Sequence, residues 1–463
     1  MTLIKSISGI RGTIGGNAGD NLTPEDIVKF TAAFGAWLQK GSKSNKVVIG
    51  RDARTSGEMV SAFVTSTLKA MGINVIDLGL STTPTVEIAV VEEKAAGGII
   101  ITASHNPVEW NALKLLNSKG EFISDADGKE LLLLAANSNY QFATVDKLGS
   151  YKNDDSYIDK HIKKILALKQ VNVKTIRSKK YKIVVDAVNS SGGIAIPKLL
   201  KALGVKEVVL LNCEPTGRFA HNPEPLPENL KALASKVKIS KADLGIAVDP
   251  DVDRLALVCE DGSMFGEEYT LVAVADYVLN SKTGNTVSNL SSTRALRDVT
   301  EMAGGKYSAA SVGEVNVVKK MKEVQAVIGG EGNGGVIYPA LHYGRDALVG
   351  IALFLSHLAA SGKKCSALRA SYPNYVISKN KIQLTKEVNI DLVFDALQKK
   401  YAQEQLNTDD GLKIEFDNKS WVHLRRSNTE PIIRIYAEAK QLKEADALAN
   451  KVIKDIKSIN HIT

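Results

Sequence analysis

Short apolar runs alternate with helix-like stretches in three successive parts of this 463-residue chain, and this alternation constrains the fold more than any other feature. The predicted strands are residues 46–50, 73–79, 97–101, 182–186, 207–211, 244–248, 286–290 and 326–328. The predicted helices are residues 57–71, 86–95, 194–203, 228–237, 293–302 and 315–322. Strands that alternate with helices are typical of βαβ units. We therefore expect three consecutive α/β domains of related topology, each with a mixed or parallel sheet.

The last part of the chain, from about residue 371, has a different order of elements. Helices are predicted at residues 392–401 and 443–456, and strands at 411–416, 421–424 and 432–437. Strands in one run, followed by a helix, predict a small α+β domain. With polar linkers at residues 153–155, 260–262 and 371–374, the predicted domains are 1–152, 153–259, 260–370 and 371–463.

The composition is that of an ordinary globular protein, with 44% hydrophobic and 24% charged residues. No apolar run approaches the ~20 residues that a membrane-spanning helix needs, and the first residues lack a secretory apolar core. We therefore expect a cytoplasmic protein with no membrane partner. The net charge of +8 is spread over helix faces rather than gathered in blocks, which favours a solvated surface over nucleic-acid binding. Cys213, Cys259 and Cys365 lack metal-ligand spacing and are interpreted as buried thiols.

Three aspartates, Asp249, Asp251 and Asp253, follow the predicted strand 244–248. If the loop curls, their carboxylates converge, and they need a shared cation because they would otherwise repel one another. Oxygen ligands suit Mg²⁺ or Ca²⁺, and Mg²⁺ keeps coordination positions open for phosphate oxygens. Three alternatives are an EF-hand, a haloacid-dehalogenase-like phosphatase and an exposed acidic turn. Arg254 argues against the EF-hand because a glycine is required at its position, and Asp253 is surplus to the phosphatase scheme.

Ser104 follows another predicted strand, 97–101, and precedes the turn-forming pair Asn106-Pro107. A serine here commonly caps a turn or helix. A hydrolase triad is less favoured because there is no Gly-x-Ser-x-Gly sequence, and His105 is only a neighbour in sequence. A phosphate on Ser104 would fit beside a divalent cation. Serine and metal together indicate phosphoryl transfer.

These two loops resemble those of the α-D-phosphohexomutase family, with Thr-Ala-Ser-His-Asn-Pro at residues 102–107 and Asp-x-Asp-x-Asp-Arg at 249–254. The family's sugar-binding loop, Gly-Glu-x-Ser-Gly-His, has a counterpart at residues 330–335. The family's phosphate-binding loop, Arg-x-Ser-Asn/Gly-Thr-x-Pro, has one at 425–431. The sugar loop departs from the pattern, since Asn333 replaces serine and Gly335 replaces histidine. Four loops in family order extend the resemblance over essentially the whole chain and imply domains arranged around a central cleft.

The resemblance implies a role for each motif residue. Phosphorylated Ser104 would be the donor, and Asp249, Asp251, Asp253 and a phosphoserine oxygen would bind one Mg²⁺. The other implied catalytic residues are Arg11, His105 and Lys114. The implied substrate-binding residues are Arg254, Glu331, Asn333, Arg425, Ser427, Asn428 and Thr429.

The reaction implied is the interconversion of hexose 6-phosphate and hexose 1-phosphate, through a phosphoserine and a hexose 1,6-bisphosphate that also primes the enzyme. Glucosamine 6-phosphate is the favoured substrate. Mannose or glucose phosphates are the alternative, and a metal-dependent sugar phosphatase or a non-catalytic sugar-phosphate sensor is more remote. The expected partner is this small molecule, and the chain is expected to be a monomer or homodimer.

Overall fold

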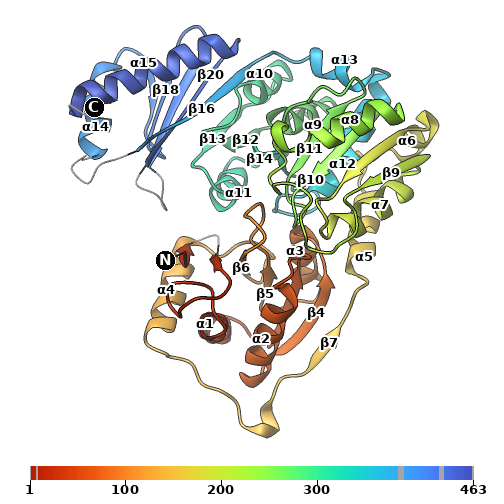
Figure 1. Cartoon of the computed structure of the whole chain (residues 1–463), viewed down its shortest axis with the longest axis vertical. Coiled ribbons are helices and arrows are strands. Elements are labelled where there is room, and N and C mark those ends of the chain that lie inside the picture. The colour runs from red at the N-terminus through yellow and green to blue at the C-terminus, as the bar shows by residue number, and fades with distance from the viewer. Residues whose placement is uncertain (1, 7–8, 384–389, 427–431, 461–463) are drawn as a thin grey trace.

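The computed structural model describes residues 2–6, 9–383, 390–426 and 432–460. These residues form four sheets, of seven, four, four and five strands. Figure 1 shows the four units that contain them, from the first unit in red and orange to the fourth in blue. The predicted architecture of three related α/β domains and a C-terminal α+β domain is confirmed.

The first three sheets contain the same four-stranded unit. Its strand orders are β4-β3-β5-β6, β9-β8-β10-β11 and β13-β12-β14-β15. In each unit the first three strands run parallel, and the last one runs antiparallel to its neighbour. The strands are β3 (Lys46–Arg51), β4 (Asn74–Leu80), β5 (Gly97–Ile101), β6 (Trp110–Leu116), β8 (Lys182–Asp186), β9 (Glu207–Leu211), β10 (Leu244–Val248), β11 (Leu255–Cys259), β12 (Thr286–Asn289), β13 (Tyr307–Ala310), β14 (Ile328–Glu331) and β15 (Gly335–Ile337).

This shared topology places the three loops of interest equivalently. Each loop connects the last parallel strand to the antiparallel strand, as residues 102–109, 249–254 and 332–334 do. Such loops lie at the carboxyl edge of the parallel strands, where open α/β sheets bind ligands. The fold therefore presents one polar loop from each of the three units at a corresponding edge.

The first sheet is extended by β1 (Ile4–Ser6), β2 (Gly9–Thr13) and β7 (Tyr151–Asn153). Helices α1 (Pro24–Gly41), α2 (Gly57–Ala70) and α4 (Asp125–Ala136) share a core with one face of this sheet, and α3 (Thr83–Glu92) packs on the other. The alternation of side chains along a strand explains both layers. Val47 and Ile49 pack with the first group of helices, whereas Val48 packs with Val86 of α3.

The second and third units share one continuous hydrophobic core. The helices that contribute to it are α5 (Tyr157–Leu166), α6 (Val173–Lys179), α7 (Gly192–Leu203), α9 (Glu267–Ser281), α10 (Ala295–Met302), α12 (Ala347–Ser361) and α13 (Cys365–Ala370). Helix α12 is apolar around its whole circumference and is buried between the two units, as expected of a core helix. Two smaller cores contain α8 (Lys231–Ser240) and α11 (Glu314–Glu323).

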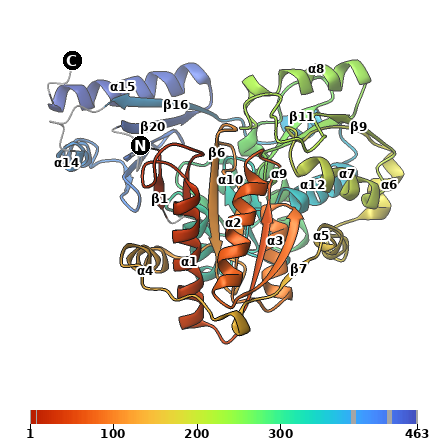
Figure 2. The same cartoon turned by 60° about the horizontal axis from the view of Figure 1, so that its bottom comes forward.

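The fourth unit is a five-stranded antiparallel sheet that packs against two helices. Its elements are β16 (Val376–Gln383), α14 (Ile390–Lys400), β17 (Gln405–Asn407), β18 (Leu412–Glu415), β19 (Trp421–Arg426), β20 (Ile432–Ala439) and α15 (Leu442–Asn460). Figures 1 and 2 both place this unit on the opposite side of the molecule from α8. The strand β16 leads into it from the third unit.

Several elements differ from the sequence prediction. Strand β6 escaped prediction because Asn111 and Lys114 interrupt its apolar pattern, although both residues are buried. The EF-hand alternative is wrong, since residues Leu255–Cys259 form strand β11 within what would be its loop. All three cysteines are free, with Cys259 and Cys365 buried and Cys213 half-buried. Among the described residues, no helix combines the length and apolar character that crossing a membrane requires.

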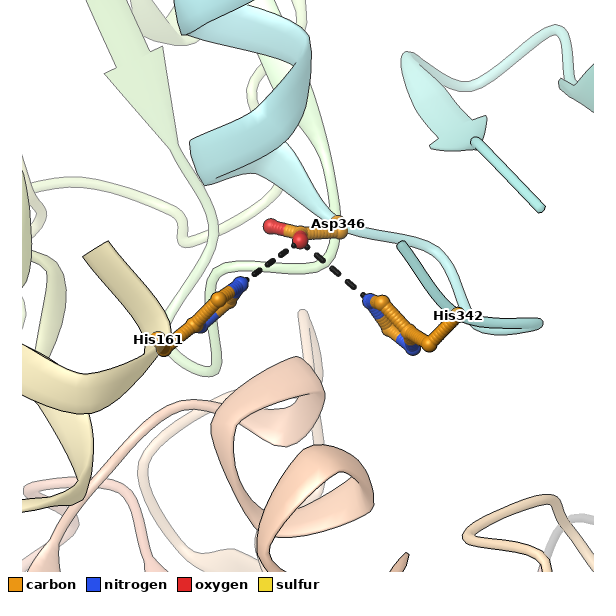
Figure 3. Close-up of side chains that lie close together, drawn as sticks. All are labelled: His161, His342 and Asp346. Atoms are coloured by element: carbon orange, nitrogen blue, oxygen red, sulfur yellow. Dashed lines mark hydrogen bonds and ion pairs between the residues drawn. The ribbon is translucent and has the colours of Figure 1, made fainter. Parts of the chain in front are cut away.

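A buried cluster of imidazole and carboxylate groups joins the first three units (Figure 3). Asp346 Oδ2 accepts hydrogen bonds from His161 Nε2 at 2.9 Å and His342 Nε2 at 3.3 Å. His342 Nδ1 lies 3.2 Å from Glu87 Oε2 of α3. Asp346 Oδ1 caps α12 by accepting from the amides of residues 348 and 349. Both Nε2 atoms donate to Asp346 and are therefore not available to bind a metal ion. We interpret the cluster as a hydrogen-bonded ion pair between units.

The cluster predicts a pH dependence of stability. Burial opposes charge on His342, but the contacts with Asp346 and Glu87 outweigh it and raise the pKa to about 10. The folded state therefore holds this proton more tightly than the unfolded chain does, where the histidine pKa is about 6.5. This stabilisation is complete below pH ~6.5 and is lost as the pH rises through the folded-state pKa.

We expect His342→Gln to lower the melting temperature most at pH 6.5, and the difference from the wild-type protein to shrink steadily toward pH 10. Thermal unfolding followed by circular dichroism at a series of pH values measures both curves. If the melting temperatures of the two proteins differ by the same amount at every pH in this range, the charged state assigned to His342 is contradicted.

Candidate active site

A cavity of about 410 Å³ lies where the loops of the first three units meet, a size suited to a small-molecule ligand. Of the residues singled out in the sequence, its lining includes Arg11, Ser104, His105, Lys114, Arg254, Glu331 and Asn333. Arg425 is not part of this lining. Ser427, Asn428 and Thr429 lie outside the described residues, so their role stays a prediction.

Ser104 lies in direct contact with the aspartate loop. Its hydroxyl donates a hydrogen bond to Asp249 Oδ2 at 2.9 Å, across 145 residues of sequence. The residue is 8% exposed and has a φ of +50°, in the left-handed region that few non-glycine residues adopt. Its amide donates to Thr102 Oγ1 at 2.9 Å, which helps to hold this conformation. The loop thus holds the serine hydroxyl against a carboxylate of another domain.

Arg54, which the sequence analysis did not single out, holds the backbone of the serine loop. Its guanidinium donates to the carbonyl oxygens of Ser104, Asn106, Pro107 and Trp110. It also forms an ion pair with Asp52 at 3.0 Å, and both side chains are fully buried. Asp52 in turn accepts from the Thr102 hydroxyl at 2.7 Å. One buried arginine therefore fixes the shape of the loop that carries Ser104.

The three aspartates converge, as the sequence predicted if the loop curls. Val252 has a φ of +64°, which is rare for a β-branched residue and marks the curl between Asp251 and Asp253. Asp249, Asp251 and Asp253 are all 0% exposed, and each offers a carboxylate oxygen within 4.8 Å of the other two. The loop closes without the glycine that an EF-hand needs.

Two oxygens in this loop are suited to binding a cation. Asp251 Oδ1 and Asp253 Oδ1 are buried and have no hydrogen-bond partner among the described residues. Their Oδ2 atoms are engaged, since Asp251 accepts from Lys114 at 2.7 Å and Asp253 accepts from Arg345 at 2.7 Å. An unpartnered buried carboxylate oxygen is costly unless it binds a cation. The donor set of hard oxygens suits Mg²⁺.

The charges of the site depend on one another. Burial and the neighbouring Asp253 and Asp251 raise the pKa of Asp249 well above its usual value. Burial opposes ionisation of Asp251 too, but Lys114 lowers its pKa. Burial likewise opposes the charge on Lys114, and the two aspartates raise its pKa. The two aspartates therefore favour the charged form of Lys114.

Three further groups border the aspartates. Arg254 lies 3.3 Å from Glu224 and about 4 Å from Asp249 and Asp253. Burial and the field of nearby cations, Arg254 first, lower the pKa of His105 to about 2, so its imidazole is neutral. Its Nδ1 lies 3.4 Å from the Ser104 hydroxyl. Arg11 of β2 lines the same cavity.

Glu331 and Asn333 come from the end of β14 and the turn after it. Glu331 is 4% exposed, and its Oε1 accepts from Asn289 at 2.8 Å and from the amide of Gly313 at 3.1 Å. Burial opposes its ionisation, but Arg345 and the hydrogen bond from Asn289 lower its pKa. Asn333 Oδ1 accepts from the amide of Gly335 at 3.2 Å. Glu331 is thus a buried, ionised acceptor at the cavity, whereas Asn333 shapes the turn.

Arg425 is linked to the cavity through an aspartate. Its Nε lies 2.7 Å from Asp410 Oδ2. The same oxygen accepts from the amide of Val312 at 2.8 Å, and Val312 lines the cavity. The fourth unit therefore contacts the third beside the cavity. Asp410 makes this contact and pairs with Arg425.

The sequence analysis missed four residues that organise this site: Arg54, Thr83, Arg345 and Asp410. Thr83, at the start of α3, donates to Asp251 Oδ2. A signal existed for Arg54, since it follows β3 at the same sheet edge as Ser104. No comparable signal existed for Arg345 or Asp410, because neither residue belongs to one of the motifs or directly follows a predicted strand.

The contacts of Arg54 predict a large loss of stability in Arg54→Gln. The substitution leaves the buried Asp52 without its cation and removes donors from several carbonyl groups, a change that typically costs about 3–5 kcal/mol. Urea unfolding measures the loss of stability as a first transition at a lower urea concentration. Lys40→Gln, which removes an exposed ion pair with Glu130, is the control and should change stability by less than about 0.5 kcal/mol. Equal effects of the two substitutions would contradict the anchoring role.

The oxygens without hydrogen-bond partners predict that metal binding depends on Asp251. Asp251→Asn should weaken Mn²⁺ binding at least about tenfold, because it removes a charged ligand and not merely an outer contact. Electron paramagnetic resonance of free Mn²⁺ during titration of the chelator-treated protein measures this affinity. Asp261→Asn, in an exposed turn, is the control and should bind as the wild type does. An unchanged affinity of Asp251→Asn would exclude this loop as the metal site.

Comparisons with known proteins agree with this geometry. Four sequence families match in order: "Phosphoglucomutase/phosphomannomutase, alpha/beta/alpha domain I" over residues 3–141, domain II over 155–262, domain III over 266–375 and the C-terminal domain over 381–455. A phosphoglucomutase/phosphomannomutase from Thermococcus kodakarensis is 37% identical over 94% of this chain and 95% of its own length. A probable phosphoglucosamine mutase from Methanopyrus kandleri is 34% identical over 96% of both.

Among solved structures, a phosphoglucomutase/phosphomannomutase family protein from Burkholderia thailandensis has a TM-score of 0.84 at 27% identity. The match covers 99% of this chain and 98% of that one. Sequence families, relatives and fold therefore agree over nearly the full length. The chain belongs to the phosphoglucomutase/phosphomannomutase family and is an enzyme of the phosphohexomutase type.

Proposed function

We propose that this protein interconverts hexose 6-phosphates and hexose 1-phosphates by passing a phosphoryl group through Ser104. The observation that carries the proposal is the 2.9 Å contact between the Ser104 hydroxyl and Asp249, beside two carboxylate oxygens without a hydrogen-bond partner among the described residues. A nucleophilic or phosphorylated oxygen next to a cation site is the arrangement that phosphoryl transfer requires.

The residues that would hold Mg²⁺ are Asp249, Asp251, Asp253 and phosphorylated Ser104. When bound, the ion supplies positive charge at the transferring phosphoryl oxygens. Lys114 and Arg254 add fixed positive charge beside the same loop, and Arg11 adds it from the cavity wall. Lys114, whose Nζ lies 2.7 Å from Asp251 Oδ2, would stabilise negative charge in the transition state.

The sugar is proposed to bind between the third and fourth units. The ionised carboxylate of Glu331 can accept hydrogen bonds from sugar hydroxyls, and Asn333 holds the turn beside it. Arg425 offers a planar guanidinium for the distal phosphate, and the neighbouring Ser427, Asn428 and Thr429 are assigned to the same phosphate on sequence alone. A hexose 1,6-bisphosphate that reverses its orientation in the cavity would return a phosphoryl group to Ser104, and the same compound would prime the unphosphorylated enzyme.

Exclusion of water is part of the proposed chemistry. Ser104 is 8% exposed, and the three aspartates are fully buried. A phosphoserine open to solvent would lose its phosphate without forming product. The burial of the serine loop therefore favours transfer to a sugar over hydrolysis.

Glucosamine 6-phosphate is the substrate we propose, because the Methanopyrus kandleri relative is named a probable phosphoglucosamine mutase. The Thermococcus kodakarensis relative, named a phosphoglucomutase/phosphomannomutase, supports glucose and mannose phosphates as the second candidate. The sugar loop has Asn333 and Gly335 where the family pattern has serine and histidine. These differences affect which sugar is preferred, since they change what surrounds Glu331.

Ser104→Ala tests the proposal. We expect it to abolish turnover and to leave the circular dichroism spectrum unchanged, because only the acceptor oxygen is removed. A coupled assay that detects the hexose 6-phosphate formed from glucosamine, glucose and mannose 1-phosphates measures turnover, and kcat/KM should be highest for glucosamine 1-phosphate. Ser118→Ala, in an exposed turn, should retain full activity.

Three results would contradict parts of this proposal. Undiminished turnover by Ser104→Ala would remove the serine from the mechanism. Release of inorganic phosphate without an isomerised sugar would indicate a phosphatase. A higher kcat/KM for glucose or mannose 1-phosphate would select the second candidate substrate.

A further inference from the structure

We propose that Arg345 is a positioning residue that joins the metal loop (residues 249–254) to the sugar loop (residues 330–335) and sets the orientation of one carboxylate in each. The proposal rests on the function proposed above, in which Asp253 binds the metal and Glu331 binds the sugar. Arg345 is 8% exposed and lies in the wall of the cavity.

The guanidinium of Arg345 contacts three carboxylates from three different segments. Its Nη2 donates to Asp253 Oδ2 at 2.7 Å, and its Nη1 donates to Glu331 Oε2 at 2.9 Å. Its Nε donates to Glu314 Oε2 at 3.0 Å. Asp253 thereby keeps Oδ1 free of hydrogen bonds from the described residues, which is the oxygen that a cation needs. One planar group thus orients a proposed metal ligand and a proposed sugar ligand at the same time.

The side chain of Arg345 occupies the space beside Gly335. A Cβ atom built on Gly335 would lie 2.3 Å from Arg345 Cδ and 3.0 Å from Cγ. Any larger residue at position 335 would therefore displace the arginine. The glycine at the end of the sugar loop and the arginine ten residues later form one structural unit.

The backbone of Arg345 is held from both sides. Its amide donates to Glu314 Oε1 at 3.1 Å, and the residue forms a β-bridge with Ile337 after the sugar loop. The next residue, Asp346, caps α12 and accepts from His161 and His342 (Figure 3). These contacts fix where the guanidinium lies and therefore make it suitable for positioning other groups.

Charge explains why the arginine is needed. Asp253, Glu314 and Glu331 are all buried, and each contacts this guanidinium. Without Arg345, three carboxylates would face one another with less compensation, and each would turn toward other donors. A lysine keeps the charge but offers a point donor instead of a fork, so it cannot hold all three carboxylates in this geometry.

The test compares two affinities of the unphosphorylated, full-length protein. Mn²⁺ binding is measured by electron paramagnetic resonance, and glucosamine 6-phosphate binding is measured by calorimetry. We expect Arg345→Gln to weaken both by about 10- to 100-fold, the range typical of losing an outer-shell partner. We expect Arg345→Lys to restore the thermal stability of the fold without restoring both affinities.

A matched control is Arg297→Gln, which removes a partly buried arginine that pairs with Glu415 away from the cavity. It should leave both affinities within about twofold of wild type, so that a general effect of losing an arginine is excluded. Gly335→Ala is a second variant that keeps every charge and displaces Arg345 sterically. We expect it to weaken both affinities as Arg345→Gln does.

Two results would overturn the proposal. The first is a folded Arg345→Gln protein in which either affinity stays within about twofold of wild type, because the arginine would then not join the two loops. The second, if Arg345→Gln does not fold, is Gly335→Ala with both affinities unchanged. Neither outcome depends on turnover, so failure of the proposed mutase reaction, seen as a wild-type protein without activity, is distinguishable from failure of this role.

Discussion

Five buried carboxylates in one place are the constraint on which the rest of this site depends. Asp249, Asp251, Asp253, Glu314 and Glu331 are each at most 8% exposed. Lys114, Arg254 and Arg345 compensate part of this charge, and two aspartate oxygens remain without hydrogen-bond partners among the described residues. Such crowding destabilises a fold unless a cation relieves it. The buried negative charge therefore favours binding of a divalent cation, as proposed for the aspartate loop.

The repeated four-stranded unit explains how residues so distant in sequence meet. Each unit ends its last parallel strand with a loop and returns through an antiparallel strand, so each presents polar side chains at the same sheet edge. Ser104, Asp249 and Glu331 occupy corresponding places in the first, second and third units. A single topology used three times thus supplies the proposed phosphoryl acceptor, the proposed cation site and the proposed acceptor for sugar hydroxyls. The shared core of the second and third units fixes the positions of their two loops relative to each other.

Much of the fold could be predicted from the sequence, because buried parallel strands are continuous apolar runs. Residues 97–101, 182–186 and 244–248 form such strands with the predicted bounds, and the partly exposed edge strand 207–211 also has its predicted bounds. Strand β6 was not predicted because the buried polar residues Asn111 and Lys114 interrupt its apolar pattern. Helix α12 was not predicted either, since it is buried on all sides and lacks the amphipathic period of a surface helix. The convergence of the aspartates could be anticipated from their spacing, whereas the contacts of Arg54 and Arg345 exist only once separate units pack together.

The departure of the sugar loop from the family pattern has a structural counterpart in this chain. Where the motif would end in histidine, the chain has Gly335, and the space beside its backbone is filled by the side chain of Arg345. A cationic group therefore still lies next to Glu331, but it comes from another segment and is held there by Glu314 and by the β-bridge with Ile337. Comparison with the family motif alone shows only that position 335 lacks the histidine side chain. The packing shows in addition that Arg345 depends on Gly335, because a side chain at position 335 would occupy the space that the arginine fills.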